Sequence, residues 1–214
     1  LLDWEEDSLG YFATRRDRLT VFSPDGKAAV SFGLSTGVAM AAGDPLGDPA
    51  SWDDAISAWL DECGDYGWVP AVISAGEKGA RAYKNFGFTV RRMGDESIIE
   101  AASFSLRGLP QVAKAVRRVR ASGARVEIRR LGDIPHEERR QLRDLANAWR
   151  NGEERGFSMA LDRTLDDVDE RELVVTVQDQ DDKTLALLAF CPWGKRGVSL
   201  DVMRRSPKAP NGVN

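Results

Sequence analysis

The residues with the clearest chemical character lie near the C-terminal end of the sequence, in the stretch MRRSPKAPNG at 203–212. It follows an apolar run, 197–203, that has the character of a strand. A strand that leads through a loop into a helix directs backbone N–H groups and the positive end of the helix dipole outward. Arg204, Arg205 and Lys208 add three cations, and Asn211 begins the expected helix. The stretch therefore predicts a seat for phosphate or another anion.

Asp201 is a carboxylate on the same predicted strand, three residues before Arg204. The regular pleat of a strand points residues three apart to opposite faces. A bulge or a splayed sheet would be needed to aim both side chains at one pocket. The alternative for Arg204 is an ion pair that caps the sheet.

The net charge of −4 conceals a basic segment. Residues 107–130 contain eight Lys or Arg and a single acid, Glu127, so this segment carries +7 and the other residues together −11. Local positive charge on an acidic protein is typical of a surface that binds phosphate on nucleic acid or lipid. A solvated helix face remains the alternative.

Several function classes are excluded by composition. The single histidine, His136, lies between Pro135 and two glutamates in the expected first turn of a helix, which predicts exposure and removes Ser-His-Asp and Cys-His mechanisms. Cys63 and Cys191 are expected to be reduced core residues, which indicates a reducing cytoplasm. No apolar run is long enough to cross a bilayer, and the start LLDWEEDS lacks the features of a secretory signal.

The first half predicts an antiparallel meander of runs 19–23, 28–34 and 37–43, with a turn at Ser23-Pro24-Asp25-Gly26. A helix begins at Asp48-Pro49, and its apolar residues recur at helical spacing: Trp52, Ala55, Ile56, Trp59, Leu60 and Cys63. These tryptophans, with Trp149 later in the chain, are expected to pack in a core. A buried strand at 68–73, a short helix at 77–86 and an extended strand at 88–100 follow.

A similar order begins again after Gly108. A helix is expected at 110–122, with an apolar stripe of Val112, Ala115, Val116 and Val119. A strand at 125–130, a helix after Pro135 and strands at 172–177, 184–190 and 197–203 complete the pattern. VFSPDGKAAVSF corresponds to VQDQDDKTLALLAF, and GVAMAAGDPLGDP to GVSLDVMRRSPKAP, which indicates an internal repeat. The loop of the first copy, 44–48, carries Asp44 and Asp48, which would repel a diphosphate.

The sequence resembles a known family over nearly all of its 214 residues. The helix ending in YKNFGF, after the meander, resembles the acyltransferase fold that uses acetyl-coenzyme A, although the glycine-rich coenzyme loop is missing from both copies. Taken whole, the chain resembles the cytosolic catalytic domain of phosphatidylglycerol lysyltransferases, the multiple peptide resistance factor family, and within it the actinobacterial branch. The stretches that carry the resemblance are DSLGYFATRRD, FSPDGKAAV, AAGDPLGDP, GDESII, QVAKAVRRVRASG, WRNGEERGFSMAL and SLDVMRRSPKAPNGVN.

The resemblance implies two fused acyltransferase-like (GNAT-like) folds of the α/β (α+β) class, with mixed, mostly antiparallel sheets flanked by helices. The two folds are expected at 1–105 and 106–214, the second incomplete. The implied activity is transfer of an aminoacyl group, usually lysyl, from its tRNA to phosphatidylglycerol at the inner face of the membrane. No coenzyme and no metal are implied. The aminoacyl ester is already activated, so the protein mainly needs to position two anionic substrates and stabilise an oxyanion.

The implied roles fall into three sets. Asp201 and Glu154 are candidates for the ammonium group of the amino acid or for proton movement, and Arg204 for the ester end or the terminal phosphate of the tRNA. Glu154 could equally be an ordinary loop carboxylate. Residues of the two motifs expected to bind substrate are Arg205, Phe157, Ser158 and Asn211. The basic helix is expected to contact the tRNA acceptor arm or anionic lipid through Lys114, Arg117, Arg118 and Arg120.

Three matters stay open at this level. The incomplete second copy is explained by a fragment, by disorder or by exchange of elements between chains, and it predicts exposed apolar surface and oligomers. A non-catalytic module that binds tRNA or lipid is the first alternative function. A peptidyltransferase that adds an amino acid to a cell-wall precursor is the second.

Overall fold

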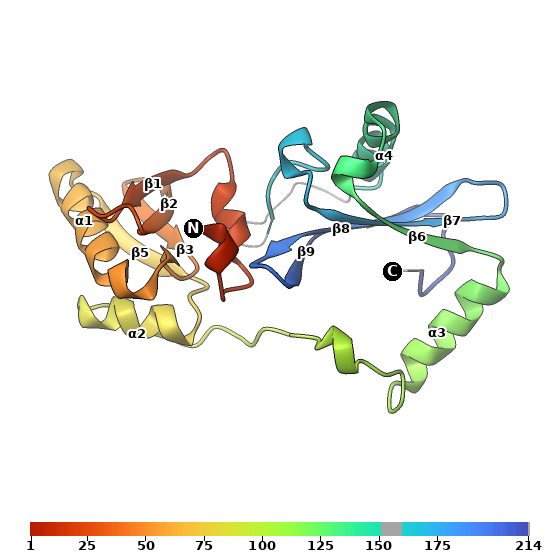
Figure 1. Cartoon of the computed structure of the whole chain (residues 1–214), viewed down its shortest axis with the longest axis horizontal. Helices are drawn as coiled ribbons and strands as arrows, with labels where there is room; N and C mark the ends of the chain where they lie inside the picture. The colour runs from red at the N-terminus through yellow and green to blue at the C-terminus, as the bar shows by residue number, and fades with distance from the viewer. Residues whose placement is uncertain (151–159, 214) are drawn as a thin grey trace. The chain divides into compact units, whose positions relative to one another are not determined.

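The computed structural model describes residues 1–150 and 160–213, which pack as two compact units. Of these residues, unit 1 contains 1–93, 160–163 and 192–199, and unit 2 contains 94–150, 164–191 and 200–213 (Figure 1). The units are thus interleaved along the chain, whereas the sequence suggests one division at residue 105. That division of the family fold stays a prediction.

Unit 1 is built on a sheet of order β1-β2-β3-β5, with the short β4 paired to β2. Pairings within β1, β2, β3 and β4 are antiparallel, and β5 runs parallel to β3. The strands are β1 (Leu19–Phe22), β2 (Ala28–Ser35), β3 (Val38–Ala42), β4 (Leu46–Gly47) and β5 (Val69–Ile73). The helices are α1 (Trp52–Tyr66) and α2 (Glu77–Asn85), with 3₁₀ turns η1 (Leu2–Trp4), η2 (Gly10–Thr14) and η3 (Pro49–Ser51).

Helix α1 carries the core of unit 1. The Asp48 carboxylate accepts a hydrogen bond from Ala50 N–H, and the helix ends at Gly67 in the left-handed conformation. The predicted apolar face is confirmed, because Trp52, Ala55, Ile56, Trp59 and Cys63 are buried and Leu60 packs against the same core. The tryptophans of α1 are thus packing residues.

The expected strand at 88–100 is wrong. Phe88 packs on the Trp59 ring at a centroid distance of 6.1 Å, but residues 89–100 are exposed and belong to no strand. A strand requires a partner, and among the described residues the sheet ends at β5. Strand β5 itself is half-buried or exposed along its length, not buried as expected.

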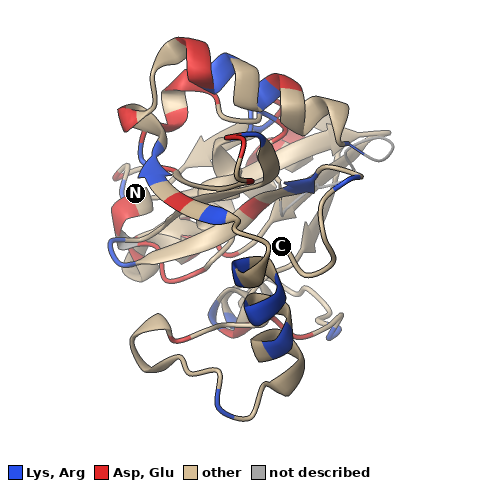
Figure 2. Ribbon diagram, turned by 90° about the vertical axis from the view of Figure 1, so that its right-hand side faces the viewer, with Lys and Arg blue, Asp and Glu red and all other residues tan. Residues whose placement is uncertain are grey.

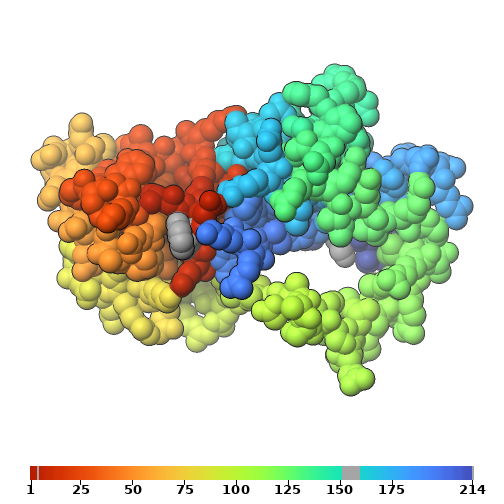
Figure 3. Space-filling view, in the orientation of Figure 1, coloured from red at the N-terminus to blue at the C-terminus, as the bar shows by residue number. Residues whose placement is uncertain are grey.

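The N-terminal segment, residues 1–18, is held in unit 1 by residues distant in sequence. The indole N–H of Trp193 donates to Glu6 O at 2.9 Å, and Ser199 Oγ donates to Ser8 O at 2.6 Å. Figure 3 displays the blue residues of this hairpin end beside the red N-terminal residues.

The described residues of unit 2 form a four-stranded sheet of order β6-β7-β8-β9, two helices and three 3₁₀ turns. The strands are β6 (Arg125–Arg130), β7 (Leu173–Gln178), β8 (Thr184–Trp193) and β9 (Gly197–Arg205). The helices are α3 (Pro110–Ala121) and α4 (His136–Ala148), and the turns η4 (Ala101–Ser103), η5 (Leu131–Asp133) and η6 (Asp167–Asp169). No helix in the described part of the chain has the length and apolar character needed to cross a membrane.

The internal repeat agrees with the structure in one three-stranded element. Strands β1, β2 and β3 are neighbours in sequence and in the first sheet, and β7, β8 and β9 are neighbours in sequence and in the second. Each copy is covered differently: α1 packs on the first meander, whereas Leu142 and Ala146 of α4 join the core beside β7 and β8.

One face of the second sheet keeps apolar side chains exposed. Val126 and Ile128 on β6 are 59% and 64% exposed, and Met203 on β9 is 47% exposed. The stripe expected on α3 is only partly buried, because Val119 is buried but Val112 is exposed. Exposed apolar surface of this kind favours association with another chain. The oligomer expected from the sequence stays a prediction.

Removing the indole of Trp59 tests how far unit 1 depends on α1. Trp59 is fully buried and its ring lies 6.2 Å from the ring of Phe32 and 6.3 Å from that of Tyr83. We expect Trp59→Ala to lower the free energy of unfolding by about 3–5 kcal/mol, since it leaves a large cavity. Urea unfolding followed by circular dichroism measures this change.

Tyr66→Ala is the matched control, because Tyr66 lies on the same helix and is 64% exposed. Its loss should be below about 1 kcal/mol. Equal losses in the two variants would contradict the placement of Trp59 at the centre of the core.

Candidate functional site

Strand β9 positions the charged residues predicted from the sequence. Val202 is buried among core residues of unit 2, Met203 and Arg205 are exposed, and Asp201 and Arg204 are half-buried. In the first part of β9 the exposed residues are Val198 and Leu200, and in the second part they are Met203 and Arg205, so the alternation of a regular pleat changes phase near Asp201 and Val202. Arg204 and Arg205 are the last two residues of β9 rather than loop residues, which corrects the expected end of the strand at residue 203.

Three acidic residues of unit 2, Asp201, Glu172 and Asp169, lie near Cys191. Cys191 on β8 is completely buried, and its thiol pKa is raised first by burial and then by the charges of Asp201, Glu172 and Asp169. Asp169 and Glu172 are themselves buried, and Glu172 N–H donates to Asp169 O at 2.8 Å. The surroundings of Cys191 are therefore acidic, and each of these negative charges favours the protonated thiol.

Asp169 and Glu172 were missed by sequence reasoning. They belong to the acidic run Asp166-Asp167-Val168-Asp169-Glu170-Arg171-Glu172, directly before β7. The available signal was a run of acids directly before β7, a strand that β8 separates from β9 in the sheet. The contact is not local, so spacing alone does not identify it.

The loop after β9 is held by its own backbone and by the neighbouring strand. Ser206 N–H donates to Leu185 O at 2.8 Å, Lys208 N–H donates to Ser206 Oγ at 3.2 Å, and Ala209 N–H donates to Ser206 O at 3.0 Å. Asn211 and Gly212 lie in a turn, and no helix follows β9 among the described residues. The cations of the predicted anion seat lie at the end of β9 and in this loop, whereas the helix expected from Asn211 does not begin within residues 206–213.

The basic helix and this loop meet. The Arg118 guanidinium donates to Asn211 O at 3.3 Å, and Val213 packs with Val119. Gly212 has φ +89°, and a Cβ there would lie 2.7 Å from the Cβ of Ala115, so only glycine fits. The structure therefore brings together two regions that the sequence predicted separately.

The cations of α3 are exposed, as predicted. The buried member of the helix is Val119, while Lys114, Arg117, Arg118 and Arg120 all face solvent. Figure 2 shows these positions as blue turns of one helix. Of the other site residues predicted from the sequence, Glu154, Phe157 and Ser158 lie outside the described residues.

His136 does not belong to a nucleophilic site. Its side chain is 80% exposed, as predicted, and Nε2 lies 3.1 Å from Asp167 Oδ2. Asp167 also accepts a hydrogen bond from the Arg139 guanidinium at 3.1 Å, so the side chains of His136 and Arg139 both meet this carboxylate. Cys63 and Cys191 are buried free thiols, which confirms that they are reduced core residues.

In unit 1, the chain's own carboxylates occupy the backbone donors of the acidic loop. Asp44 Oδ1 accepts a hydrogen bond from Gly76 N–H, at the start of α2, at 2.7 Å. Glu5 Oε1 accepts Gly47 N–H at 2.7 Å, and Asp7 Oδ2 accepts Asp44 N–H at 3.1 Å. These contacts give a physical reason why the first copy is expected not to hold an anion: its donors are already satisfied by carboxylates.

Burial makes these acids titrate near neutral pH. Burial raises the pKa of Glu5 to about 7, against the lowering effect of the Gly47 hydrogen bond. Burial, and then the charge of Asp7, raise the pKa of Asp44 to about 6. The folded state therefore favours the protonated form of both carboxyl groups.

The comparisons with known proteins agree with one another. A family model described as "Phosphatidylglycerol lysyltransferase, C-terminal" matches residues 1–214. The chain belongs to this family. Two bifunctional lysylphosphatidylglycerol biosynthesis proteins LysX, from Nocardia farcinica and Mycobacterium ulcerans, are each 50% identical to it over 211 and 210 residues. These alignments cover 97% of this chain but 19% of each relative, so the chain spans about a fifth of the curated relatives it matches.

Two solved structures share the fold. L-PGS from Bacillus licheniformis has a TM-score of 0.82 at 22% identity, over 96% of this chain and 63% of that chain. The C-terminal domain of a putative lysylphosphatidylglycerol synthetase from Agrobacterium fabrum has a TM-score of 0.84 at 21% identity, over 97% and 67%. The predicted fold class, α/β with acyltransferase-like folds whose mostly antiparallel sheets are flanked by helices, is confirmed.

The raised pKa of Glu5 predicts a pH dependence of stability. The folded pKa of about 7 exceeds the ordinary value of 4.5, so protonated Glu5 contributes its full stabilisation of the fold below about pH 4.5, and this contribution is lost as pH rises through 7. In the wild type the free energy of unfolding should therefore decline by up to about 3 kcal/mol over this range. We expect this decline to be absent in Glu5→Gln, since the neutral amide oxygen accepts from Gly47 N–H at every pH. Urea unfolding at pH 4.5, 6 and 8 measures the difference between wild type and variant.

Glu6→Gln is the control for this prediction. Glu6 is the next residue, its side chain is 75% exposed, and it pairs with Lys78. Its pH profile should follow that of the wild type. A Glu5→Gln profile parallel to that of the wild type would contradict the buried, protonated state of Glu5.

Proposed function

We propose that the chain is the catalytic part of an enzyme that transfers an aminoacyl group, lysyl in the names of its relatives, from tRNA to phosphatidylglycerol. The family match over residues 1–214 is the observation that carries the proposal. The chemistry of unit 2 supports it, because the acidic residues near Cys191, Asp201 among them, would suit a cationic amino acid, and the cations of α3 would suit a polyanion.

The proposed reaction is an ester exchange. A glycerol hydroxyl of phosphatidylglycerol attacks the carbonyl carbon of the aminoacyl ester, and a tetrahedral oxyanion forms. The bond from that carbon to the ribose oxygen of the tRNA then breaks. The proton of the attacking hydroxyl passes to the ribose oxygen, so a new ester and an uncharged tRNA result. Neither redox chemistry nor an added energy source is required.

We assign Asp201, with the neighbouring carboxylates, to the ammonium group of the amino acid or to the proton transfer. Arg204 is assigned to the oxyanion or the terminal phosphate of the tRNA. Among the described residues β9 is the last strand in its order, so a substrate at this edge of the sheet could reach side chains of both faces. Arg205 and Asn211 flank the same end, and the family motif adds Glu154, Phe157 and Ser158.

The basic helix is assigned to the tRNA. Arg118 ties it to the Asn211 loop, so a polyanion on α3 would have its end near β9. Phosphatidylglycerol would be met at the inner face of the membrane, where the enzyme would act. Transfer is tested with labelled lysyl-tRNA and phosphatidylglycerol vesicles, in the protein at its native length, by counting label in the organic phase.

The same assay separates the alternative functions. Label that appears only when a peptide acceptor is supplied would favour the peptidyltransferase alternative. Binding of lysyl-tRNA without any transferred label would favour the non-catalytic module. Label from alanyl-tRNA in place of lysyl-tRNA would change the amino acid but not the reaction class.

Arg204→Ala tests the assignment of the β9 cation. We expect the transfer rate to fall about a hundredfold, as for removal of one group that stabilises the oxyanion or anchors the substrate. Arg196→Ala is the matched control, because Arg196 is an exposed arginine just before β9, and its rate should be unchanged. An unchanged rate in Arg204→Ala would remove this residue from the site.

Neutralising α3 tests its assignment to tRNA. We expect the triple variant Lys114→Gln, Arg117→Gln, Arg120→Gln to bind lysyl-tRNA more weakly and to reduce the salt dependence of binding by about one unit of slope for each cation that had neutralised a phosphate. Fluorescence anisotropy at several salt concentrations measures this. Lys84→Gln on α2 serves as the control. Weakened binding to phosphatidylglycerol vesicles, with tRNA binding unchanged, would reassign the helix to lipid.

A further inference from the structure

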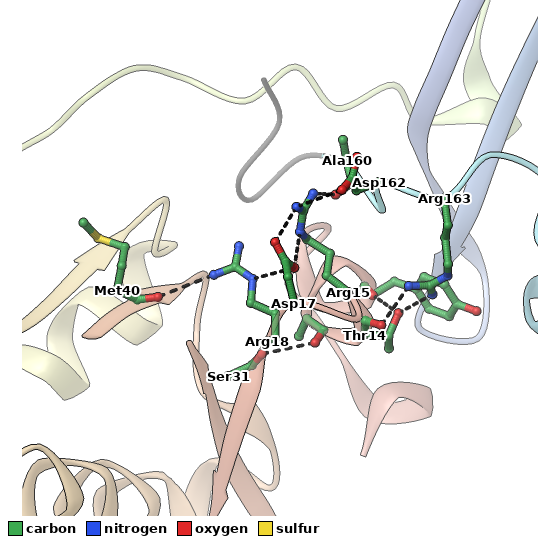
Figure 4. Close-up of polar contacts among 11 residues, drawn as sticks. Thr14, Arg15, Asp17, Arg18, Ser31, Met40, Ala160, Asp162 and Arg163 are labelled. Atoms are coloured by element: carbon green, nitrogen blue, oxygen red, sulfur yellow. Dashed lines mark hydrogen bonds and ion pairs between the residues drawn. The ribbon is translucent and has the colours of Figure 1, made fainter. Parts of the chain in front are cut away.

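Two stretches of unit 1 that lie far apart in sequence hold each other through arginines (Figure 4). Arg15 NH1 donates to the carbonyl of Ala160 at 2.8 Å. In the opposite direction, Arg163 NH1 donates to the carbonyl of Thr14 at 2.8 Å, and its NH2 donates to Thr14 Oγ1 at 2.7 Å. Each stretch thus supplies one guanidinium and one backbone acceptor, and we call this arrangement the reciprocal clasp.

The Arg15 guanidinium is held rigidly as well as buried. Its side chain is 7% exposed, and it forms a two-bond fork with Asp17: Nε to Oδ1 at 2.9 Å and NH2 to Oδ2 at 2.7 Å. The same NH2 lies 3.7 Å from Asp162 Oδ2. Because a guanidinium has fixed donor directions, the fork on Asp17 also fixes the direction in which NH1 meets Ala160.

The backbone that the clasp holds is in an unusual conformation. Asp162, between Ala160 and Arg163, has φ +57°, in the left-handed region that residues other than glycine seldom occupy. Such a conformation persists only where its surroundings determine it, and such residues cluster at functional sites. Here Arg15 acts on both sides of the turn, through Ala160 O and the Asp162 carboxylate.

The clasp joins two of the stretches that carry the family resemblance. Thr14, Arg15 and Asp17 belong to DSLGYFATRRD, and Ala160 belongs to WRNGEERGFSMAL, whose residues 151–159 lie outside the described part. Ala160 and Leu161 are buried. Packing therefore holds the end of the second motif in the interior, and the hydrogen bond from Arg15 orients its backbone carbonyl. Apolar packing alone would tolerate small shifts of this backbone, whereas directed hydrogen bonds to its carbonyl do not.

We propose that Arg15 and Arg163 are positioning residues for aminoacyl transfer: the reciprocal clasp fixes the backbone of residues 160–163, at the end of the WRNGEERGFSMAL motif. This inference rests on the proposed transferase function. In this proposal neither arginine contacts substrate. They act through the direction they give to Ala160 and the residues that follow it.

Arg15→Lys and Thr14→Val test the proposal in the protein at its native length. Lysine keeps the charge but cannot form the fork to Asp17 and reach Ala160 O at the same time. Valine keeps the shape of threonine but removes the acceptor of Arg163 NH2. We expect kcat for transfer to fall at least tenfold in Arg15→Lys and about threefold in Thr14→Val, with KM for lysyl-tRNA within twofold of wild type. Thermal unfolding identifies the temperature range in which each variant is folded, and rates are compared there.

Arg81→Lys is the matched control, since Arg81 is an exposed arginine of unit 1 that pairs with Glu77 one helical turn away. Its kcat and melting temperature should both stay at wild-type values. Folded Arg15→Lys with wild-type kcat, or a loss of rate that only follows the unfolded fraction, would overturn the role of the clasp. A wild-type protein that transfers no label would instead overturn the proposed function, and this role with it. Should Arg15→Lys fail to fold, Thr14→Val decides between these outcomes.

Discussion

The place of strand β9 in its sheet is the constraint on which the site in unit 2 depends. Among the described residues β9 is the last strand of the sheet and pairs with β8. Val202 fixes the strand in the core of the unit, and Asp201 and Arg204 lie on either side of this buried residue, three positions apart. The sheet therefore holds a carboxylate and a guanidinium close together along one strand. A substrate that carries an ammonium group at one end and phosphates at the other would meet both charges there.

The two units differ in the charges at the end of their meanders. In unit 1, backbone donors near β4 and α2 are satisfied by Glu5 and Asp44, and burial raises the pKa of both carboxyl groups. A Cβ at Gly79 would lie 2.1 Å from Asp44 Oδ1, so the approach of this carboxylate depends on a residue without a side chain. In unit 2, the corresponding meander ends with Arg204 and Arg205, and Lys208 follows in the loop. The second copy thus carries additional cations at this position. In the first copy the chain's own carboxylates already bind the backbone donors.

Local pattern was enough to predict most elements. The apolar spacing of Trp52 to Cys63 identified α1, and the turn at Ser23-Pro24-Asp25-Gly26 identified the β1-β2 hairpin, because both signals lie within one element or its turn. The segment 88–100 failed, since apolar character predicts a strand but cannot supply its partner. The cations of α3 and β9 were likewise visible in the sequence. The contact of Arg118 with Asn211, and the approach of Asp169 and Glu172 to Cys191, depend on packing between elements and were not.

The burial of Cys191 bears on how such a protein should be studied. Its thiol is inaccessible and is held protonated by burial and by the acids around it, and Cys63 is buried as well. Alkylating and mildly oxidising reagents attack the thiolate, so they should leave both cysteines of this chain intact while the fold persists. Labelling of either sulfur would therefore report opening of the core. A chemist could attach a probe through a cysteine introduced at the surface without first removing the native pair.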